Sequence, residues 1–178
     1  MLMDSVDIQD KAEKIKLLIL DVDGILTDGR IIYDSKGRDL KLFDVHDGLG
    51  VHILSHMGIK VILITAKASK AIKPRARDMR VDKVYGSIIP KTKVYDKILK
   101  DYNLKDEQIC FMGDDLVDIG ILKRVGLPIS VPDACKEAKD LSAYITEKRG
   151  GRGAVREVVE LILKSQSKWQ DAVKIYDK

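Results

Sequence analysis

Cysteine, aromatic residues and long apolar runs are all scarce in this chain of 178 residues. It has only two cysteines, Cys110 and Cys135, without a CxxC spacing or a nearby histidine, which argues against a disulfide framework and a thiolate metal site. The longest apolar runs, such as the one at 61–64, are far shorter than the roughly 20 residues of a membrane-spanning helix. We therefore expect a globular protein that does not contact a membrane.

The chain also lacks a strong excess of charge of one sign. Its 32 lysine and arginine residues and 28 aspartate and glutamate residues leave a formal net charge of +4, and the basic residues are spread along the chain. Without a dense basic block, nucleic acid is not the expected partner. The N-terminal stretch 1–14 carries charges from its start and no apolar core, so it predicts no signal peptide, and we expect a cytoplasmic protein.

Short apolar runs alternate with amphipathic stretches along most of the chain. The runs predict buried strands at 17–20, 61–64, 84–85, 109–112, 129–131 and 143–146. The amphipathic stretches predict helices at 48–57, about 71–79, 94–102, 116–125, about 135–141 and from 154 onward. This alternation predicts one α/β domain over 1–178, a Rossmann-like parallel sheet with helices on both faces, whose last helix and tail occupy about 154–178.

One segment departs from this alternation. The stretches 30–33 and 40–43 flank the turn-forming sequence Asp34-Ser35-Lys36-Gly37, which predicts a β-hairpin. A lone hairpin is only marginally stable in water. The six large apolar side chains of this one must therefore pack either on the rest of the domain or on another subunit.

The sequence Asp21-Val22-Asp23-Gly24 follows the first predicted strand directly. In an open α/β sheet, ligands bind at the carboxyl ends of the strands, and both carboxylates reach that crevice if the chain turns after Asp21, which Gly24 makes easy. One carboxylate can attack phosphorus and bind a cation while the other handles the proton of the leaving group. The motif alone is equally compatible with a solvated turn at a strand end.

Three further features favour a phosphoryl-transfer site. Thr65 ends one predicted strand, Lys91 precedes an amphipathic helix, and a Gly-Asp-Asp sequence at 113–115, with Asp118 close behind, ends another strand. Phosphoryl transfer needs the positioning and neutralisation of charge. Carboxylates suit Mg²⁺, while a hydroxyl and an ammonium group suit the phosphoryl oxygens. Each feature alone has an ordinary structural explanation, and it is their order along the chain that predicts the site.

These four motifs, DVDGILTDG at 21–29, the threonine at a strand end, the downstream lysine and GDDLVD at 113–118, resemble those of the haloacid dehalogenase superfamily. Within it, the chain is most similar to the phosphatases of 3-deoxy-D-manno-octulosonate 8-phosphate. That similarity rests on the LTDG continuation, the hairpin, DVHDG at 44–48 and GGRGAVRE at 150–157, and it extends over roughly 16–163. It implies a capless fold with a hairpin flap at about 30–43. It also implies Mg²⁺-dependent hydrolysis of this sugar-acid phosphate through an aspartyl-phosphate, a step of lipopolysaccharide precursor synthesis.

The resemblance implies a role for each matching residue. Asp21 is the expected nucleophile and Asp23 the acid and base, and Thr65 and Lys91 complete the catalytic set. Mg²⁺ would be held by Asp21, the backbone carbonyl of Asp23 and Asp114, with Asp115 and Asp118 orienting these ligands. The expected substrate contacts are Asp23, Asp44, Val45, His46, Asp47, Gly48, His52, Lys67, Arg75 and Lys91.

Some of these positions depart from the family pattern. His46, His52 and Lys67 stand where arginines are common, and Ala66 replaces a glycine. Because the planar fork of arginine suits a carboxylate, the departures leave open another acidic sugar phosphate, such as a nine-carbon keto-sugar acid 9-phosphate. A receiver-like phospho-aspartate domain and a non-catalytic relative are the alternatives from other classes.

The spacing of the motifs leaves no room for a large cap domain. About forty residues separate Asp23 from Thr65, and the hairpin, one helix and one strand use them. A phospho-aspartate site still needs shielding from water. With the homotetramer that the resemblance implies, we expect a hairpin to cover the active site of a neighbouring subunit.

Overall fold

The computed structural model describes residues 5–177. Its elements are α1 (Ser5–Glu13), β1 (Leu17–Leu20), β2 (Ile32–Tyr33), β3 (Asp39–Leu40), α2 (Val45–His56), β4 (Lys60–Ile64), α3 (Ile72–Asp78), β5 (Lys83–Tyr85), α4 (Thr92–Tyr102), η1 (Asp106–Gln108), β6 (Ile109–Met112), η2 (Leu116–Asp118), α5 (Ile119–Leu122), β7 (Leu127–Ser130), α6 (Lys136–Leu141), β8 (Tyr144–Ile145), α7 (Ala154–Ser165) and α8 (Trp169–Lys174). Residues 1–4 and 178 lie outside the described residues. They belong to the predicted domain 1–178, and residues 1–4 also belong to the N-terminal stretch 1–14 that predicts no signal peptide. Among residues 5–177, no helix has both the length and the apolar character needed to cross a membrane.

Six parallel strands form the central sheet in the order β5-β4-β1-β6-β7-β8. β1 lies inside the sheet, with Leu20 opposite both Leu63 of β4 and Met112 of β6. Every residue of β1 and β6 is buried, as expected for strands that are covered on both faces. The chain runs from β1 outward to β4 and β5 and then returns to β6 on the other side, so the topological switch point lies beside β1.

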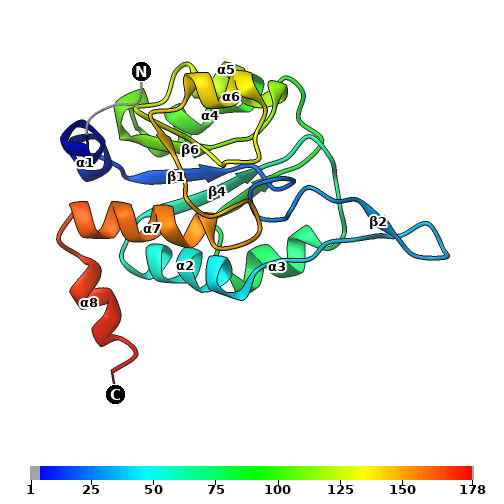
Figure 1. Cartoon of the computed structure of the whole chain (residues 1–178), viewed down its shortest axis with the longest axis horizontal. Helices are drawn as coiled ribbons and strands as arrows, with labels where there is room; N and C mark the ends of the chain where they lie inside the picture. The colour runs from blue at the N-terminus through cyan, green and yellow to red at the C-terminus, as the bar shows by residue number, and fades with distance from the viewer. Residues whose placement is uncertain (1–4, 178) are drawn as a thin grey trace.

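Helices cover both faces of the sheet (Figure 1). α4, α5 and α6 lie on one face, α2, α3 and α7 lie on the other, and α1 packs against α7. α7 buries a regular apolar face that includes Val155, Val158, Val159 and Ile162. The predicted parallel sheet with helices on both faces is confirmed.

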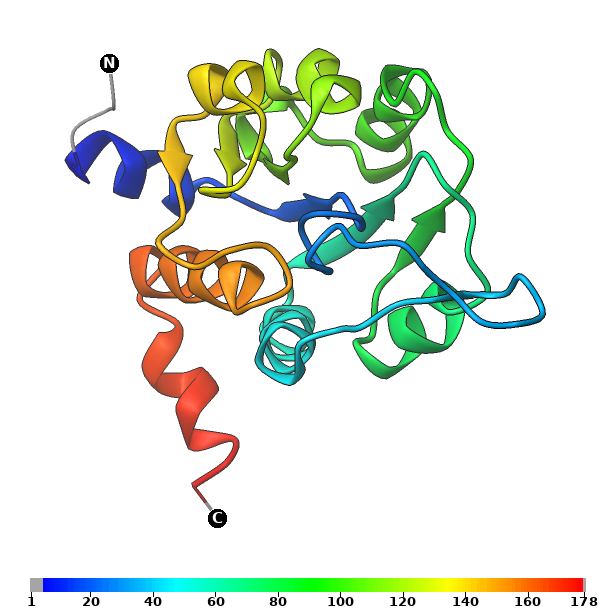
Figure 2. The same cartoon turned by 45° about the vertical axis from the view of Figure 1, so that its right-hand side comes forward.

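The predicted hairpin is present as a separate two-stranded antiparallel sheet. β2 pairs with β3, with Ile32 opposite Leu40 and Tyr33 opposite Asp39. Its turn is held by the carboxylate of Asp34, which accepts two backbone N–H groups of the turn at 2.9 and 2.8 Å. The hairpin projects from the end of the molecule toward which β1 runs (Figures 1 and 2).

Several boundaries differ from the sequence prediction. α2 begins at Val45 rather than at residue 48, because the carboxylate of Asp44 accepts the first free N–H groups of the helix. The helix predicted at 116–125 is a 3₁₀ turn followed by the four-residue α5, since the carboxylate of Asp118 turns inward to the loop before it. α1 and α8 were not predicted from the sequence.

Candidate active site

The loop after β1 carries Asp21 and Asp23. The N–H of Asp21 donates to the carbonyl of Met112 at 3.0 Å, so Asp21 is still held at the end of the sheet beside β6. Beyond it the chain turns back, held by hydrogen bonds to the carbonyl of Val22. Gly24 has a φ of +97°, and a Cβ there would lie 2.0 Å from Oδ2 of Asp114, so only glycine lets this loop pass so close to that carboxylate.

Lys91 stands at the start of α4, and its side chain is 1% exposed. Its Nζ donates to Oδ1 of Asp21 and, at 2.6 Å, to Oδ1 of Asp118. Burial alone lowers the pKa of Lys91, but the two carboxylates beside it raise this pKa above its usual value. Lys91 is therefore a charged ammonium group held against the predicted nucleophile.

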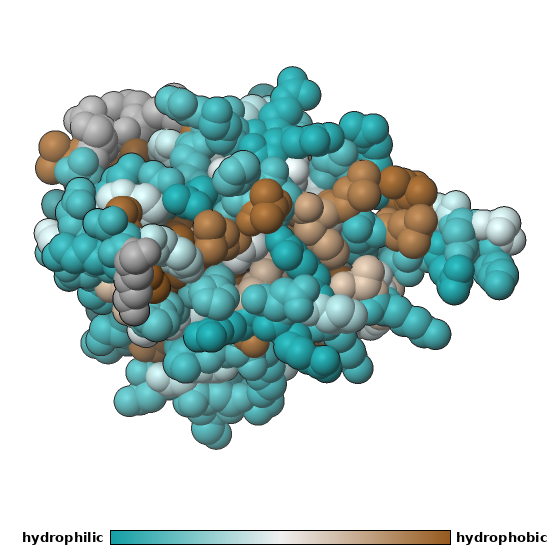
Figure 3. Space-filling view, turned by 90° about the horizontal axis from the view of Figure 1, so that it is seen from below, coloured by the Kyte–Doolittle hydropathy of each residue, from teal (hydrophilic) through white to brown (hydrophobic). Residues whose placement is uncertain are grey.

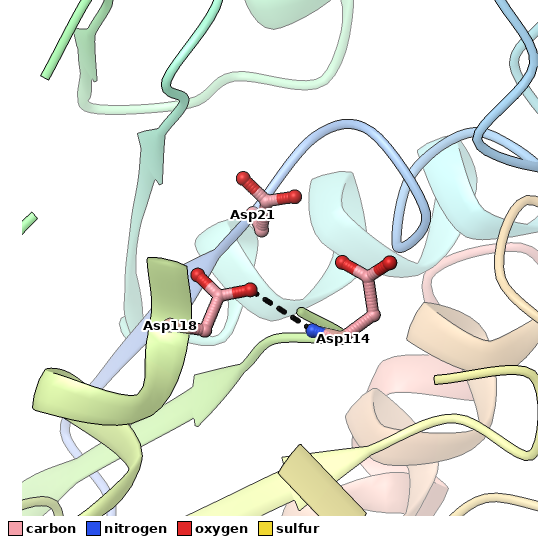
Figure 4. A group of neighbouring side chains, drawn as sticks. All are labelled: Asp21, Asp114 and Asp118. Carbon is pink, nitrogen blue, oxygen red and sulfur yellow. Dashed lines mark hydrogen bonds between the residues drawn. The ribbon is translucent and has the colours of Figure 1, made fainter. Parts of the chain in front are cut away.

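Asp118 organises the loop after β6 (Figure 4). Its Oδ2 accepts the N–H of Asp114 at 3.0 Å and that of Asp115 at 3.2 Å, while its Oδ1 accepts Lys91. Both oxygens of Asp118 are thus occupied, which fits a role in orienting the neighbouring carboxylates. Asp114, in contrast, has a buried oxygen, Oδ1, without a hydrogen-bond partner.

Asp21, Asp114 and Asp118 each offer a carboxylate oxygen within 4.8 Å of the others. Burial raises the pKa of Asp21 to about 7, against the opposing effect of Lys91. Burial, together with the charges of Asp21 and Asp118, raises the pKa of Asp114 to about 8. A divalent cation beside Asp21 and Asp114 would relieve the repulsion and give the unpaired oxygen of Asp114 a partner. The residues present therefore fit a Mg²⁺ ion.

Two of these three carboxylates, those of Asp21 and Asp114, line a pocket of about 310 Å³. It is lined by Asp21, Asp23, Gly29, Thr65, Ala66, Lys67, Lys91, Asp114, Asp115 and Val117. Thr65 follows β4, and its Oγ1 accepts the N–H of Lys67 at 3.2 Å and donates to the Lys67 carbonyl at 3.0 Å, which fixes the hydroxyl at the pocket wall. All predicted catalytic and metal-binding residues thus meet in one pocket, and three predicted substrate contacts, Asp23, Lys67 and Lys91, share its lining.

Lys41, at the base of the hairpin, is a neighbour of the site that the sequence did not reveal. Its Nζ donates to Oδ1 of Asp23. Lys67 makes a second contact with the hairpin, since its Nζ donates to the hydroxyl of Tyr33 at 2.9 Å. The hairpin therefore meets the active site of its own chain at two points. The signal that could have identified Lys41 is its place between two leucines, on a strand whose side chains alternate between two faces.

The predicted substrate contacts at 44–48 do not line this pocket. The first two residues of α2 are exposed. Asp47 is buried, and its carboxylate accepts the N–H of Gly153 at 3.1 Å and that of Arg156 at 2.8 Å, which joins α2 to the start of α7. Burial raises the pKa of Asp47 to about 6. These contacts give Asp47 a structural role, and its contact with substrate stays a prediction.

Arg75 lies against the joint between the hairpin and α2. Its Nη2 donates to the carbonyl of Asp44 at 2.7 Å, and its guanidinium carbon lies 5.6 Å from the centre of the Phe43 ring. Its Nε is buried and has no hydrogen-bond partner. Arg75 also lines a second pocket of about 340 Å³ with His52. The substrate contacts of Arg75 and His52 likewise stay predictions.

A parallel sheet with an acidic loop after β1, a threonine after β4, a buried lysine at α4 and a second acidic loop after β6 defines a phosphoryl-transfer enzyme of the haloacid dehalogenase type. The haloacid dehalogenase-like hydrolase family matches residues 79–158.

Comparison with known proteins narrows this class. A 3-deoxy-D-manno-octulosonate 8-phosphate phosphatase of Yersinia pestis is 38% identical over 166 residues, covering 93% of this chain and 89% of that protein. The phosphatase of that name from Moraxella catarrhalis, solved with magnesium, phosphate and KDO, has a TM-score of 0.94 and 38% identity, covering 97% of this chain and 99% of that one. The cobalt-bound Haemophilus influenzae phosphatase has a TM-score of 0.88 and 32% identity, covering 94% of this chain and 99% of that one. The chain belongs to the family of 3-deoxy-D-manno-octulosonate 8-phosphate phosphatases.

Proposed function

We propose that this chain is a Mg²⁺-dependent phosphatase that hydrolyses 3-deoxy-D-manno-octulosonate 8-phosphate to the free sugar acid and phosphate. The main support for this proposal is the arrangement around Asp21. This buried residue is hydrogen-bonded to Lys91 and shares one pocket with Asp23, Thr65 and Asp114. The relatives that the chain resembles over nearly its whole length are named for this substrate, and the Moraxella structure holds magnesium, phosphate and KDO. The reaction would supply a precursor of lipopolysaccharide in the cytoplasm.

In the first half-reaction, a carboxylate oxygen of Asp21 attacks phosphorus, and the bond between phosphorus and the sugar oxygen breaks. Asp23 gives its proton to the departing oxygen and becomes a carboxylate. Lys91 and Thr65 hold phosphoryl oxygens at the pocket wall and balance the charge that spreads over them. When bound by Asp21, Asp114 and the backbone carbonyl of Asp23, Mg²⁺ supplies further neutralisation of that charge.

In the second half-reaction, water attacks the phosphorus of the aspartyl-phosphate. Asp23 takes the proton of this water, the bond between phosphorus and Asp21 breaks, and phosphate leaves. Both aspartates return to their starting states. Asp115 and Asp118 do not touch the reacting atoms in this scheme, because Asp118 holds the loop and the ammonium group of Lys91 in place.

The test is a phosphatase screen over sugar phosphates with Mg²⁺ present. We expect the highest kcat/KM for the eight-carbon sugar-acid 8-phosphate, and no activity on any acidic sugar phosphate would contradict the proposal. One different substrate has specific support: His46, His52 and Lys67 replace arginines that are common in the family. A nine-carbon keto-sugar acid 9-phosphate therefore belongs in the same screen. The receiver-like and non-catalytic alternatives do not fit a member of a phosphatase family.

We also propose that the enzyme is a homotetramer in which each hairpin covers a neighbouring active site. The hairpin and the rim of the active site expose large apolar side chains, namely Ile31, Ile32, Tyr33, Leu40, Leu42, Ile89, Leu116 and Val117. Figure 3 shows apolar residues gathered beside the projecting tip of the hairpin. Contiguous exposed apolar surface of this kind favours burial against a partner, and a second copy of the chain is the partner proposed here.

A further inference from the structure

The returning segment of the hairpin, from β3 through Leu42, has its polar and apolar faces reversed. Side chains alternate along a strand, and where one face packs on a protein body the apolar side chains normally take that face. Here Leu40 and Leu42 are 50% and 65% exposed, whereas the side chain of Lys41 between them is 4% exposed. A lysine just beyond β3 therefore points inward where an apolar side chain would be expected.

The partner of Lys41 is the acid and base proposed for the reaction. Its Nζ donates to Oδ1 of Asp23, and among residues 5–177 no other carboxylate lies within ion-pair distance of this lysine. An ammonium group that leaves water needs such a partner, because an unpaired buried charge is costly. Asp23 is itself 27% exposed at its side chain and lines the pocket of Asp21. Its Oδ2 has no side-chain hydrogen bond in the described part of the chain, so that oxygen is available to the pocket.

A second lysine ties the other strand of the hairpin to the same pocket. Nζ of Lys67 donates to the hydroxyl of Tyr33 at 2.9 Å and lies 5.0 Å from the centre of the Tyr33 ring. Lys67 lines the pocket of Asp21. Because the hairpin has this second attachment, we expect it to stay in place when Lys41 alone is replaced.

We propose that Lys41 is a positioning residue for Asp23 and, through it, for proton transfer in both half-reactions. By holding Oδ1, Lys41 fixes the direction in which Oδ2 meets the leaving oxygen and later the attacking water. The inference rests on the proposed acid and base role of Asp23, and it extends the catalytic apparatus to the hairpin.

The proposal predicts that the loss of Lys41 affects substrates differently, according to their leaving groups. An alkoxide needs a proton from Asp23 as it departs, whereas p-nitrophenolate leaves without one. Loss of Lys41 therefore slows the phosphorylation of Asp21 by an alkyl phosphate but not by p-nitrophenyl phosphate. The removal of phosphate from Asp21 slows with both substrates, since it needs Asp23 to deprotonate water.

The first experiment compares Lys41→Met with the wild-type full-length enzyme in the presence of Mg²⁺. Rapid mixing with p-nitrophenyl phosphate should give a burst of p-nitrophenol at nearly the wild-type rate, followed by turnover about 10- to 100-fold slower. With an alkyl phosphate, kcat should fall by a similar factor and no burst should appear. Lys41→Arg should restore most of the loss. Lys36→Met removes an exposed charge from the same hairpin and should change neither step.

The second experiment is a double-mutant cycle with Asp23→Asn. If Lys41 acts through Asp23, the double variant loses no more activity than Asp23→Asn alone. Multiplicative losses, an equal loss in the burst with p-nitrophenyl phosphate, or a Lys41→Met enzyme as active as Lys36→Met would overturn the inference. A wild-type enzyme that hydrolyses no phosphomonoester would instead overturn the proposed function, and this inference with it. Unchanged thermal midpoints would show that the variants fold.

Discussion

The two walls of the active site are built in different ways. On the sheet side, Asp21, Lys91 and Asp118 are almost fully buried and hold one another through charged hydrogen bonds. On the hairpin side, Tyr33 and Leu42 are more than half exposed, and the contacts with the pocket are two lysines that reach across. The sheet-side wall is thus held together within one chain, whereas the hairpin-side wall is largely open to solvent.

This difference follows from what each wall must do. Charge development on a phosphoryl group is stabilised best by groups that are fixed before the reaction, and burial among hydrogen bonds fixes them. A substrate must enter and leave, so its wall is expected to contain movable or shared elements. The predictions below test whether the two walls separate in function as they do in structure.

The largest effect is expected at the nucleophile. Asp21→Asn should lower kcat by about 10⁴-fold or more, because an amide oxygen neither attacks phosphorus nor carries charge to a cation. The variant should keep the fold, since Asn still fits beside Lys91. Steady-state assays with both a sugar phosphate and p-nitrophenyl phosphate measure the loss, and trapping of phosphorylated protein should fail. Substantial turnover in this variant would remove Asp21 from the mechanism.

Removal of the metal is expected to have the next largest effect. Chelation with EDTA should reduce turnover to background, and Mg²⁺ should restore it. Without a cation, the positive charge near Asp21 and Asp114 is too small to balance the repulsion between their carboxylates. Activity that survives complete chelation would contradict the metal role of Asp114.

The binding of Mg²⁺ should also depend on pH. The pKa of Asp21 is raised to about 7 and that of Asp114 to about 8, so the metal-free folded state binds these two protons more tightly than the unfolded chain does. Protonation of both groups therefore favours the metal-free folded state over the unfolded state. That contribution to stability is lost as the pH rises through these values. Mg²⁺ competes with the same protons, so its increase in the thermal midpoint should grow from about pH 6 to about pH 9. Asp114→Asn is the matched control, and it should flatten this dependence.

The buried wall was the more predictable one from sequence. β1 and β6 have the predicted bounds because a short, continuous apolar run that is buried on both faces leaves little choice of structure. The order of Asp21, Thr65, Lys91 and Asp114 along the chain sufficed to predict that these residues meet at one edge of the sheet.

The hairpin side was less predictable, because its contacts join residues that are distant in sequence. The residues next to Lys41 in the sequence do not predict that it pairs with Asp23. Those next to Asp47 likewise do not predict that its carboxylate accepts N–H groups at the start of α7. The helix expected at 116–125 was shortened for the same reason, since Asp118 bonds to Lys91 of another element. The predicted hairpin was correct in type, but five of its six large apolar side chains, all except Phe43, are exposed in the single chain.

The fourth prediction concerns the assembly of subunits at the hairpin side of the active site. Leu40→Ser combined with Leu42→Ser changes two outward-facing side chains and leaves Lys41 in place. Wild-type enzyme should sediment as a tetramer at micromolar concentration, and the double variant should dissociate and lose about tenfold in kcat/KM for the sugar-acid phosphate. Val6→Ser, an exposed apolar residue on α1, is the control. A wild-type enzyme that is fully active as a monomer would refute the shared site.

The smallest effect is expected for the replacement of Arg75, and this is the most specific test of sugar recognition on the hairpin side. Its guanidinium already holds the carbonyl of Asp44, while its Nε is buried without a partner, so it has a donor left for a ligand carboxylate. If Arg75 reads the sugar acid, Arg75→Ala should raise KM for the sugar-acid phosphate by about tenfold, with little change for p-nitrophenyl phosphate. Arg77→Ala, an exposed arginine of the same helix, should change neither. Equal changes with both substrates, accompanied by a lower thermal midpoint, would mean that Arg75 only braces the joint between the hairpin and α2. The recognition of the substrate carboxylate would then belong to other residues, and the open wall would depend on the neighbouring subunit for its cations.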